Sequence, residues 1–194
     1  MLLIWVLAAA VLTGYLRGGR LKHYVQEPLG WLACPIVAFA LEALIPLWQR
    51  LSLPETVWLG CMVLAQYALL LLFCYRNRSR GISMLLIGLA SLSNLAAMCC
   101  NGFRMPVSSA VYDYPVFASF VARVSAGELP EYVIVNHTAP LWFLGDVIPL
   151  PYVLPGMASV GDVLLGVGIF LLMQQLMGLG KGKSSVATPT PVKK

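Results

Sequence analysis

The chain has 194 residues, of which 59% are hydrophobic and 11% are charged, and its formal net charge is +5. Soluble globular domains are about half apolar and about a quarter charged, so this chain has too few charges for an ordinary soluble surface. The apolar content also excludes a disordered chain, and the modest excess of Lys and Arg argues against a nucleic-acid-binding protein. The composition therefore predicts an all-α integral membrane protein with one domain, whose first partner is the lipid bilayer.

Membrane-spanning segments are the first elements that the sequence predicts in chain order. A helix needs about 20 mostly apolar residues to cross a bilayer. Five stretches are predicted to span: residues 1–16, 29–49, 56–75, 81–100 and 160–180. The first has its basic residues after the apolar run, so we expect a retained anchor and not a cleaved signal peptide. Together these stretches form a membrane domain over residues 1–180, followed by a disordered basic tail over residues 181–194.

The basic residues predict how the chain is oriented. Ten of the thirteen Lys and Arg residues lie in segments 17–28, 76–80 and 181–194, which five crossings place on one side of the membrane. Loops rich in Lys and Arg remain on the cytoplasmic side. The sequence therefore predicts an N-terminus outside and a cytoplasmic C-terminus.

Residues 101–159 separate the fourth and fifth predicted helices on the outer side. Within them, apolar residues recur at helical spacing over 116–124, with Asp113 as a plausible N-cap and Gly127 as a stop signal. The run over 140–156 is also apolar, but its prolines prevent a regular helix. We therefore expect an outer cap formed by an amphipathic helix and a Pro-rich loop packed on the bundle.

Three segments of the outer region and the last helix resemble a known family. They are Asn101-Gly-Phe-Arg-Met-Pro106, Leu141-Trp-Phe-Leu-Gly-Asp-Val-Ile-Pro149 and Ser159-Val-Gly-Asp162. Together they are similar to a family of small bacterial multi-pass membrane proteins of unknown function. The resemblance runs from the first predicted helix through the fifth. It implies a location in the bacterial cytoplasmic (inner) membrane and implies no particular activity.

Polar side chains collect near the predicted outer side of the membrane. Ionisable groups are costly inside a bilayer, so they are expected to be paired or functional. We therefore predict an outward-facing polar pocket beneath the cap, and an ion pair between Glu42 and Arg104. The candidate binding residues are Glu42, Asn94, Asn101, Arg104, His137, Asp146 and Asp162.

Asp146 and Asp162 are the strongest catalytic candidates, because two close carboxylates can share a proton and act as acid and base. The segments around them are faintly similar to the aspartate motifs of lipoprotein signal peptidases, although no Asn- and Arg-bearing motif precedes Asp146 and the helix count differs. A structural role competes with this interpretation. Ser159 and Asp162 match a capping box at a helix start, and Asp146 after Gly145 is also a common turn residue.

No cofactor and no metal site is predicted. His23 and His137 are expected on opposite sides of the membrane, so they cannot ligate one haem within the bundle, and a zinc site lacks ligands. The sequence has neither a Gly-x-Ser-x-Gly nucleophile motif nor a phosphate-binding glycine loop. The five cysteines lie in apolar stretches without Cys-x-x-Cys spacing and are expected to be buried.

The function predicted from these features is that of a non-catalytic accessory or scaffold subunit, or of a small binding protein, in a bacterial inner membrane. Other membrane subunits are then its partners. The alternative is an intramembrane aspartyl hydrolase that acts on a membrane-anchored substrate at the outer face. A transporter is disfavoured, because the sequence contains no internal repeat.

Overall fold

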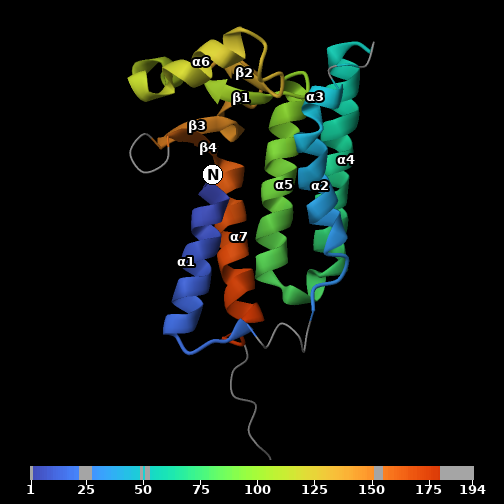
Figure 1. Ribbon diagram of the computed structural model, residues 1–194, viewed down its shortest axis with the longest axis vertical. Coiled ribbons are helices and arrows are strands. Elements are labelled where there is room, and N and C mark those ends of the chain that lie inside the picture. Colours follow the sequence, from blue (N-terminus) through green and yellow to red (C-terminus); the bar gives the residue numbers. More distant parts are fainter. Residues whose placement is uncertain (1, 22–27, 49, 51–52, 151–154, 180–194) are drawn as a thin grey trace, which may run out of the picture.

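A bundle of helices carries a small sheet and short helices at one end (Figure 1). The computed structural model describes residues 2–21, 28–48, 50, 53–150 and 155–179. The bundle consists of α1 (Leu2–Leu16), α2 (Ala33–Ala43), α3 (Ile45–Trp48), α4 (Glu55–Arg76), α5 (Ile82–Cys100) and α7 (Val160–Leu176). At the end opposite the sheet, the short 3-10 helix η2 (Arg78–Arg80) connects α4 and α5.

The described residues 101–150 and 155–159 form the cap. Its strands are β1 (Met105–Ser108), β2 (Tyr132–Val135), β3 (Asp146–Leu150) and β4 (Gly156–Ser159). Its helical elements are η3 (Ser109–Asp113), η4 (Pro115–Phe117), α6 (Ala118–Ser125) and η5 (Trp142–Leu144).

The long helices begin and end at residues suited to those positions. Glu55 lies in the first turn of α4 and Arg76 in its last turn, so both charges oppose the helix dipole. Before α5, Gly81 has a φ of 65°, a left-handed conformation that glycine adopts without strain. A capping box formed by Ser159 and Asp162 starts α7.

The structure changes the predicted membrane spans. Among the described residues, α4 and α5 are long and apolar enough to cross a membrane, in agreement with segments 56–75 and 81–100. Helices α1 and α7 have 15 and 17 residues and are shorter than a typical span. Five full-length spanning helices are therefore not what the structure shows. Residues 1, 49 and 180 of the predicted spans, and the predicted tail over 181–194, lie outside the described residues.

The largest correction concerns the predicted span over 29–49. It contains the 11-residue α2 and the 4-residue α3, separated at Leu44. Pro46 has no N–H with which to continue the hydrogen-bond ladder, so an uninterrupted helix over the whole stretch is disfavoured. The prediction of one continuous helix was wrong because the effect of this proline was neglected.

The prediction of an all-α protein is confirmed in part: the described structure is mostly helical, but the cap also contains a four-stranded sheet in the order β2-β1-β3-β4. β1 runs parallel to β2 and to β3, whereas β3 and β4 are antiparallel. The stretch over 140–156, predicted as a Pro-rich loop, contains β3 and the first residue of β4. Pro149 is tolerated within β3, because β1 pairs with β3 at Val107 and Asp146 but not beyond.

The predicted amphipathic helix over 116–124 is present as α6 and the preceding η4, and it packs on the sheet. A buried cluster of Val107, Val111 and Phe117 joins β1 to η3 and η4. The cap thus has its own small hydrophobic core. A second cluster, which includes Leu59, Met98 and Met105, joins this end of α4 and α5 to β1.

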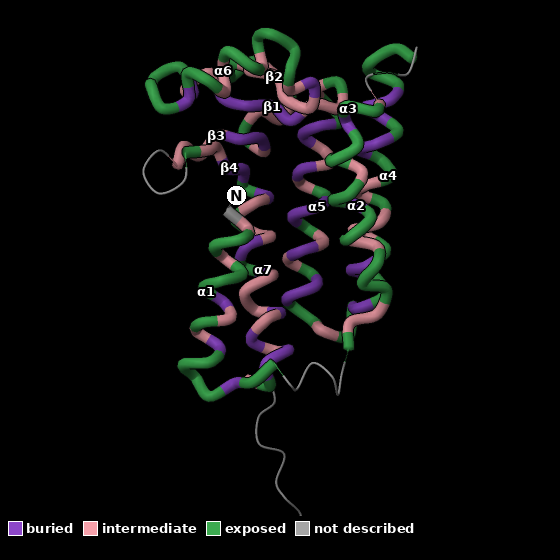
Figure 2. The backbone as a smooth tube through the Cα atoms, viewed as in Figure 1, coloured by how far each residue is buried: buried purple, intermediate pink, exposed green. Residues whose placement is uncertain are grey.

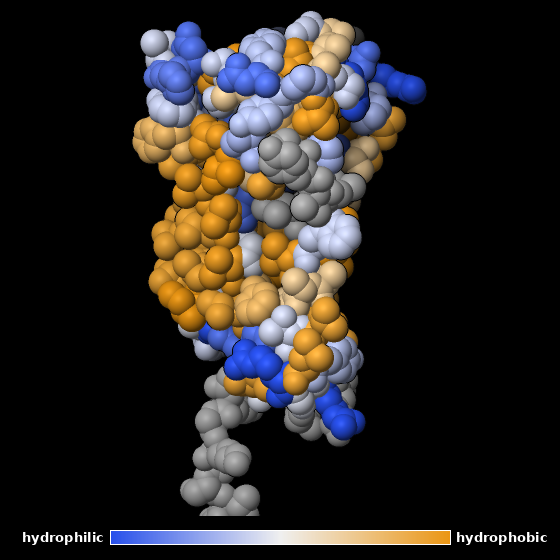
Figure 3. Space-filling view, turned by 90° about the vertical axis from the view of Figure 1, so that its left-hand side faces the viewer, coloured by the Kyte–Doolittle hydropathy of each residue, from blue (hydrophilic) through white to orange (hydrophobic). Residues whose placement is uncertain are grey.

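The helices of the bundle leave many apolar side chains on the surface. The most buried face of α5 lies in the middle of the bundle, and much of α1 and α2 is exposed (Figure 2). α5 packs against both α7 and α4, while α1 packs on α7 and α2 packs on α4. The space-filling view shows a wide hydrophobic band between two more hydrophilic ends (Figure 3).

Candidate functional site

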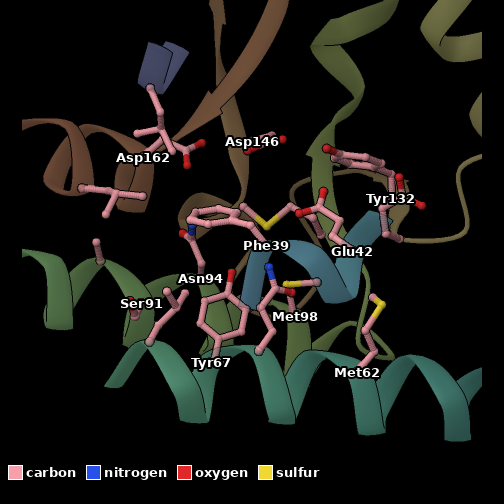
Figure 4. A pocket seen from close by; sticks show the side chains of 17 residues that line it. Phe39, Glu42, Met62, Tyr67, Ser91, Asn94, Met98, Tyr132, Asp146 and Asp162 are labelled. Atoms are coloured by element: carbon pink, nitrogen blue, oxygen red, sulfur yellow. The ribbon is translucent and has the colours of Figure 1, made fainter. Parts of the chain in front are cut away.

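A cavity of about 190 Å³ lies where the helices meet the underside of the cap. Its walls come from five helices and from strands β1, β2 and β3, so residues distant in the sequence surround it (Figure 4). The lining residues are Leu3, Phe39, Glu42, Met62, Gln66, Tyr67, Leu70, Ala90, Ser91, Asn94, Met98, Met105, Glu131, Tyr132, Asp146, Asp162 and Leu165.

Four carboxyl groups line this cavity. Glu42 comes from α2, Glu131 precedes β2, Asp146 begins β3, and Asp162 lies in the first turn of α7. They are half of the eight Asp and Glu residues in the chain. The described lining residues include no Lys, Arg or His, so no basic side chain lies among these acids. The electrostatic character of the cavity is therefore strongly acidic.

Asp146 is the most deeply buried of the four acids. The residue is 8% exposed, and no described residue forms a hydrogen bond or ion pair with its carboxyl group. Burial, together with the nearby charge of Asp162, raises the pKa of Asp146 to about 8. At neutral pH the group is therefore mainly protonated, and it ionises in mildly alkaline solution or when a positive charge approaches.

The backbone of the cap fixes the position of Asp146. β3 pairs here with both neighbours, through Val107 of β1 and Ser159 of β4. The preceding residue is Gly145, and a Cβ atom at this position would overlap the carbonyl oxygen of Pro106. This close backbone approach requires glycine and holds the start of β3 against β1.

Asp162 has a different environment, because its carboxylate takes part in the capping box. Its Oδ2 accepts a hydrogen bond from the Ser159 backbone N–H at 2.9 Å. The Ser159 hydroxyl accepts one from the Asp162 backbone N–H, also at 2.9 Å, and donates to Asn94 Oδ1 at 3.1 Å. The predicted capping role of Asp162 is confirmed, and the same residue also lines the cavity.

Asn94 links the middle of the bundle to this capping box. It is buried on α5, and a Cβ atom at Gly161 would overlap its side chain, so α5 and α7 approach each other very closely here. The Tyr67 hydroxyl lies beside Asn94 in the cavity (Figure 4). Asn94 therefore connects α5 to the start of α7, and it also forms part of the cavity wall.

Glu131 and Glu42 complete the acidic set. Glu131 Oε2 is buried without a hydrogen-bond partner among the described residues. Burial raises the pKa of this carboxyl group above its usual value. Glu42 is exposed on the surface of α2, and no described residue forms an ion pair with it. The two carboxyl groups thus extend the acidic lining from beneath the cap to the outer surface of α2.

The predicted ion pair between Glu42 and Arg104 was wrong. Arg104 instead contacts Glu55 at the start of α4, with 2.6 Å between Nη2 and Oε1. Both side chains are partly exposed, so solvent limits the contribution of this pair to stability. The prediction paired residues by their expected depth in the membrane and overlooked Glu55, which lies just before the predicted span over 56–75.

Four of the seven predicted binding residues line the cavity, and the other three do not: Asn101, Arg104 and His137 lie outside it. Asn101 donates through Nδ2 to the carbonyl groups of Ala97 and Pro140, both at 2.8 Å, and so ties the end of α5 to the cap. The His137 ring packs edge-on against Trp142, with 4.2 Å between the ring centroids. Their roles in this structure are architectural.

Tyr67, Tyr132 and Glu131 also line the cavity, although they are not among the residues predicted from the sequence. Gln66 and Tyr67 are polar groups inside an otherwise apolar span, which is a signal that could have drawn attention to this part of α4. Tyr132 and Glu131 gave no comparable signal, because their position depends on the pairing of β1 with β2.

The lining residues limit the chemistry of the site. Among the described residues, no group of three or more His, Cys, Asp or Glu side chains is placed to hold a metal ion. The described cysteines are free thiols, and none of them lines the cavity. What the cavity offers is negative charge next to aromatic rings and thioether groups, which is suited to binding an organic cation.

Comparisons with known proteins give a family but no activity. No curated protein and no solved structure matches the chain. Residues 27–174 match the model of the family of unknown function DUF5317, which agrees with the resemblance to an uncharacterised family found in the sequence. Because the match covers most of the chain, the protein belongs to the DUF5317 family.

Proposed function

We propose that this protein is a membrane-embedded binding protein that takes a small organic cation in the acidic cavity beneath its cap. One observation carries the proposal: four carboxyl groups, and no basic side chain, line one cavity in the described structure. Burying an unpaired acid such as Asp146 destabilises a fold, and strongly perturbed acids of this kind cluster at functional sites. A bound cation supplies the missing positive charge.

An organic cation fits the lining better than a metal ion. Divalent cations require several oxygen ligands converging within about 2.0–2.6 Å, and the described acids form no such group. Ammonium groups need looser contacts and are attracted to aromatic faces. Phe39, Tyr67 and Tyr132 provide such faces next to the carboxyl groups (Figure 4).

The membrane location rests on the surface of the bundle. In the most apolar parts of α4 and α5, 39% of the residues are buried, whereas the core helix of a soluble protein is mostly buried. Their remaining side chains contribute to an apolar exterior that lipid would cover. We propose that α1, α2 with α3, and α7 cross with them, as five tilted or locally broken segments of a bacterial inner membrane.

The orientation follows from the two ends of the bundle. Arg78 and Arg80 lie at the end opposite the cap, as does the segment that contains Arg17 and Arg20 (Figure 1). Basic residues favour the cytoplasmic side. The proposal therefore places the cap and the N-terminus outside and the C-terminus inside.

The test is binding of tetramethylammonium to the protein in phosphatidylcholine nanodiscs, measured by isothermal titration calorimetry. Saturable binding is expected for the wild type, and Asp146→Asn should weaken it at least about tenfold, since one charge-assisted contact contributes more than about 1.4 kcal/mol. Glu128→Gln is the matched control, because it removes one acid that pairs with Arg123 outside the cavity. No binding to the wild type, or equal losses in both variants, would overturn the proposal.

The alternative function is that of an intramembrane aspartyl hydrolase. It is favoured by the shared position of Asp146 and Asp162 in one cavity, and by the effect of Asp162 on the pKa of Asp146. The capping box weighs against it, because the Asp162 carboxylate already accepts a hydrogen bond from Ser159. Cleavage of a membrane-anchored peptide by the wild type, lost in both Asp146→Asn and Asp162→Asn, would favour the hydrolase.

An accessory or scaffold role in a larger membrane assembly stays a prediction. Purification of the native protein from membranes in a mild detergent tests it. Stoichiometric copurification of another membrane protein would support the subunit, whereas a lone protein that binds the cation would support the binding protein.

A further inference from the structure

The cap closes the cavity on the side away from the bundle. This wall consists of Met105 from β1, Tyr132 from β2 with the preceding Glu131, and Asp146 from β3. The cap also contains its own buried cluster, so it is a packed layer and not a loose loop. A direct path from the outer solution through the sheet is therefore blocked by these residues.

The helices leave a different side open. The extensive contacts in the bundle join α1 to α7, α7 to α5, α5 to α4, and α4 to α2, whereas no comparably extensive contact joins α1 to α2 among the described residues. The helices thus form an arc with α1 and α2 at its two ends. Both ends reach the cavity, because Leu3 of α1 and Phe39 and Glu42 of α2 line it.

The side chains at this opening face the region that lipid would occupy. Phe39 is 50% exposed although it lines the cavity, and Ile4 next to Leu3 is 66% exposed. Glu42 is also exposed and lies one helical turn from Phe39 on the same face of α2. Apolar groups and one carboxyl group therefore border the opening.

The lining also restricts the charge of an amphiphile that enters this way. Phospholipid head groups carry phosphate, and an anionic phosphate needs basic or N–H partners. The described lining has four acids and no basic side chain, so a phosphate would be repelled there. An ammonium group that is the sole charge of its molecule avoids this repulsion. Below the acids, Leu70 and Leu165 provide apolar wall for part of a chain.

We propose that the ligand is a cationic amphiphile, an alkylammonium whose chain lies in the outer leaflet and whose head group enters the cavity sideways between α1 and α2. This inference rests on the proposed function, because it specifies the kind of cation that the acidic cavity takes and the direction from which it arrives. The carboxyl groups hold the ammonium, while the chain leaves through the opening into lipid.

The experiment compares two probes that share one head group: tetramethylammonium and dodecyltrimethylammonium, each titrated into the protein in phosphatidylcholine nanodiscs. Empty nanodiscs provide the correction for partitioning into lipid. The amphiphile is concentrated in the bilayer, so its half-saturating total concentration should be at least about tenfold lower. Dodecylphosphocholine, which carries the same chain and a phosphate, should not compete.

The outcomes separate the inference from the proposed function. If tetramethylammonium binds and dodecyltrimethylammonium binds more weakly or not at all, the sideways route is overturned while the cation site stands. If neither cation binds, both fail. If dodecylphosphocholine competes as well as the cationic amphiphile, the assignment of the head-group class is overturned.

A pair of adjacent substitutions tests the route itself. Leu3→Trp places a larger side chain at the opening, whereas Ile4→Trp adds the same bulk at a neighbouring exposed position that does not line the cavity. We expect Leu3→Trp to weaken binding of the amphiphile about tenfold and Ile4→Trp to change it less than about twofold. Equal binding by the two variants would contradict entry between α1 and α2.

Discussion

Acids on the surface near the cap and acids in the cavity beneath it differ in their partners. On the surface, Glu55 pairs with Arg104 at 2.6 Å and Glu128 pairs with Arg123 at 3.3 Å. Such exposed pairs contribute about 0–1 kcal/mol to stability. In the cavity, Asp146 is almost fully buried and has no partner among the described residues.

This distribution is the reverse of what stability alone would favour. A buried charge without a partner is costly, whereas an exposed one is well solvated. If folding stability were the sole requirement, the arginines would be most useful next to the cavity. This difference is the basis of the proposed function, in which an external positive charge balances the acids of the cavity.

The largest predicted effect is on the pH dependence of stability. The pKa of Asp146 is raised in the folded state, so the fold binds one more proton than the unfolded chain between about pH 4 and pH 8. The stabilising contribution of Asp146 to the free energy of unfolding is therefore present at low pH and is lost as the pH rises through about 8. Asp146→Asn should remove this loss and stabilise the protein near pH 9, by up to about 5 kcal/mol.

The measurement is the thermal unfolding midpoint in nanodiscs, followed by tryptophan fluorescence from about pH 5 to pH 9. Asp162, Glu42 and Glu131 are the other acids of the cavity and are present in both proteins, so the difference between the two curves isolates Asp146. Parallel curves for the wild type and Asp146→Asn would show that Asp146 is not held in an unfavourable environment.

A smaller effect is expected from Gly145→Ala, which disturbs the position of Asp146 without changing a charge. The new Cβ atom would overlap the Pro106 carbonyl oxygen, so the backbone at the start of β3 has to move. We expect a loss of about 2–3 kcal/mol in unfolding free energy and a weaker pH dependence as Asp146 gains solvent. An unchanged midpoint and an unchanged pH profile would contradict the close packing of β3 on β1.

Ser159→Ala distinguishes the capping role of Asp162 from its place in the cavity. The substitution removes the hydroxyl that accepts from the Asp162 N–H and donates to Asn94. The loss of a helix cap of this kind costs about 1–2 kcal/mol. The carboxylates stay in place, so binding of tetramethylammonium should change little. A loss of binding as large as that of Asp146→Asn would assign Ser159 to the binding site.

The smallest effect is expected on the surface side of the comparison. Arg104→Met breaks the contact with Glu55. The Arg104 side chain is 35% exposed and the Glu55 side chain is 44% exposed. The unfolding free energy should therefore fall by less than about 1 kcal/mol. A much larger loss would mean that Arg104 also balances the acids of the cavity, and the contrast between surface and cavity would then fail.

The sequence was most informative about the elements whose physics is local. The apolar runs over 56–75 and 81–100 correspond to α4 and α5, and the capping box at Ser159 and Asp162 is present as predicted. These features depend on neighbouring residues in the chain. The same reasoning failed near Pro46 in α3, because α2 and α3 are separated at Leu44 although the stretch is mostly apolar.

The sheet was missed because its strands are four or five residues long and pair over long sequence distances. Short apolar strands interrupted by proline have no clear period, so they resemble loops in the sequence. The candidate site could be predicted in part. The position of an acid near a helix end brought in Glu42 and Asp162, but Tyr132 and Glu131 reach the cavity through the pairing of β1 with β2.

The most direct test of the central claim is the number of protons released when tetramethylammonium binds. Calorimetric titrations near pH 7 in buffers of different ionisation enthalpy measure this number. Because Asp146, with a pKa of about 8, is mainly protonated at that pH, binding should release up to about one proton more in the wild type than in Asp146→Asn. Binding without proton release in the wild type, or equal release in both proteins, would contradict the account.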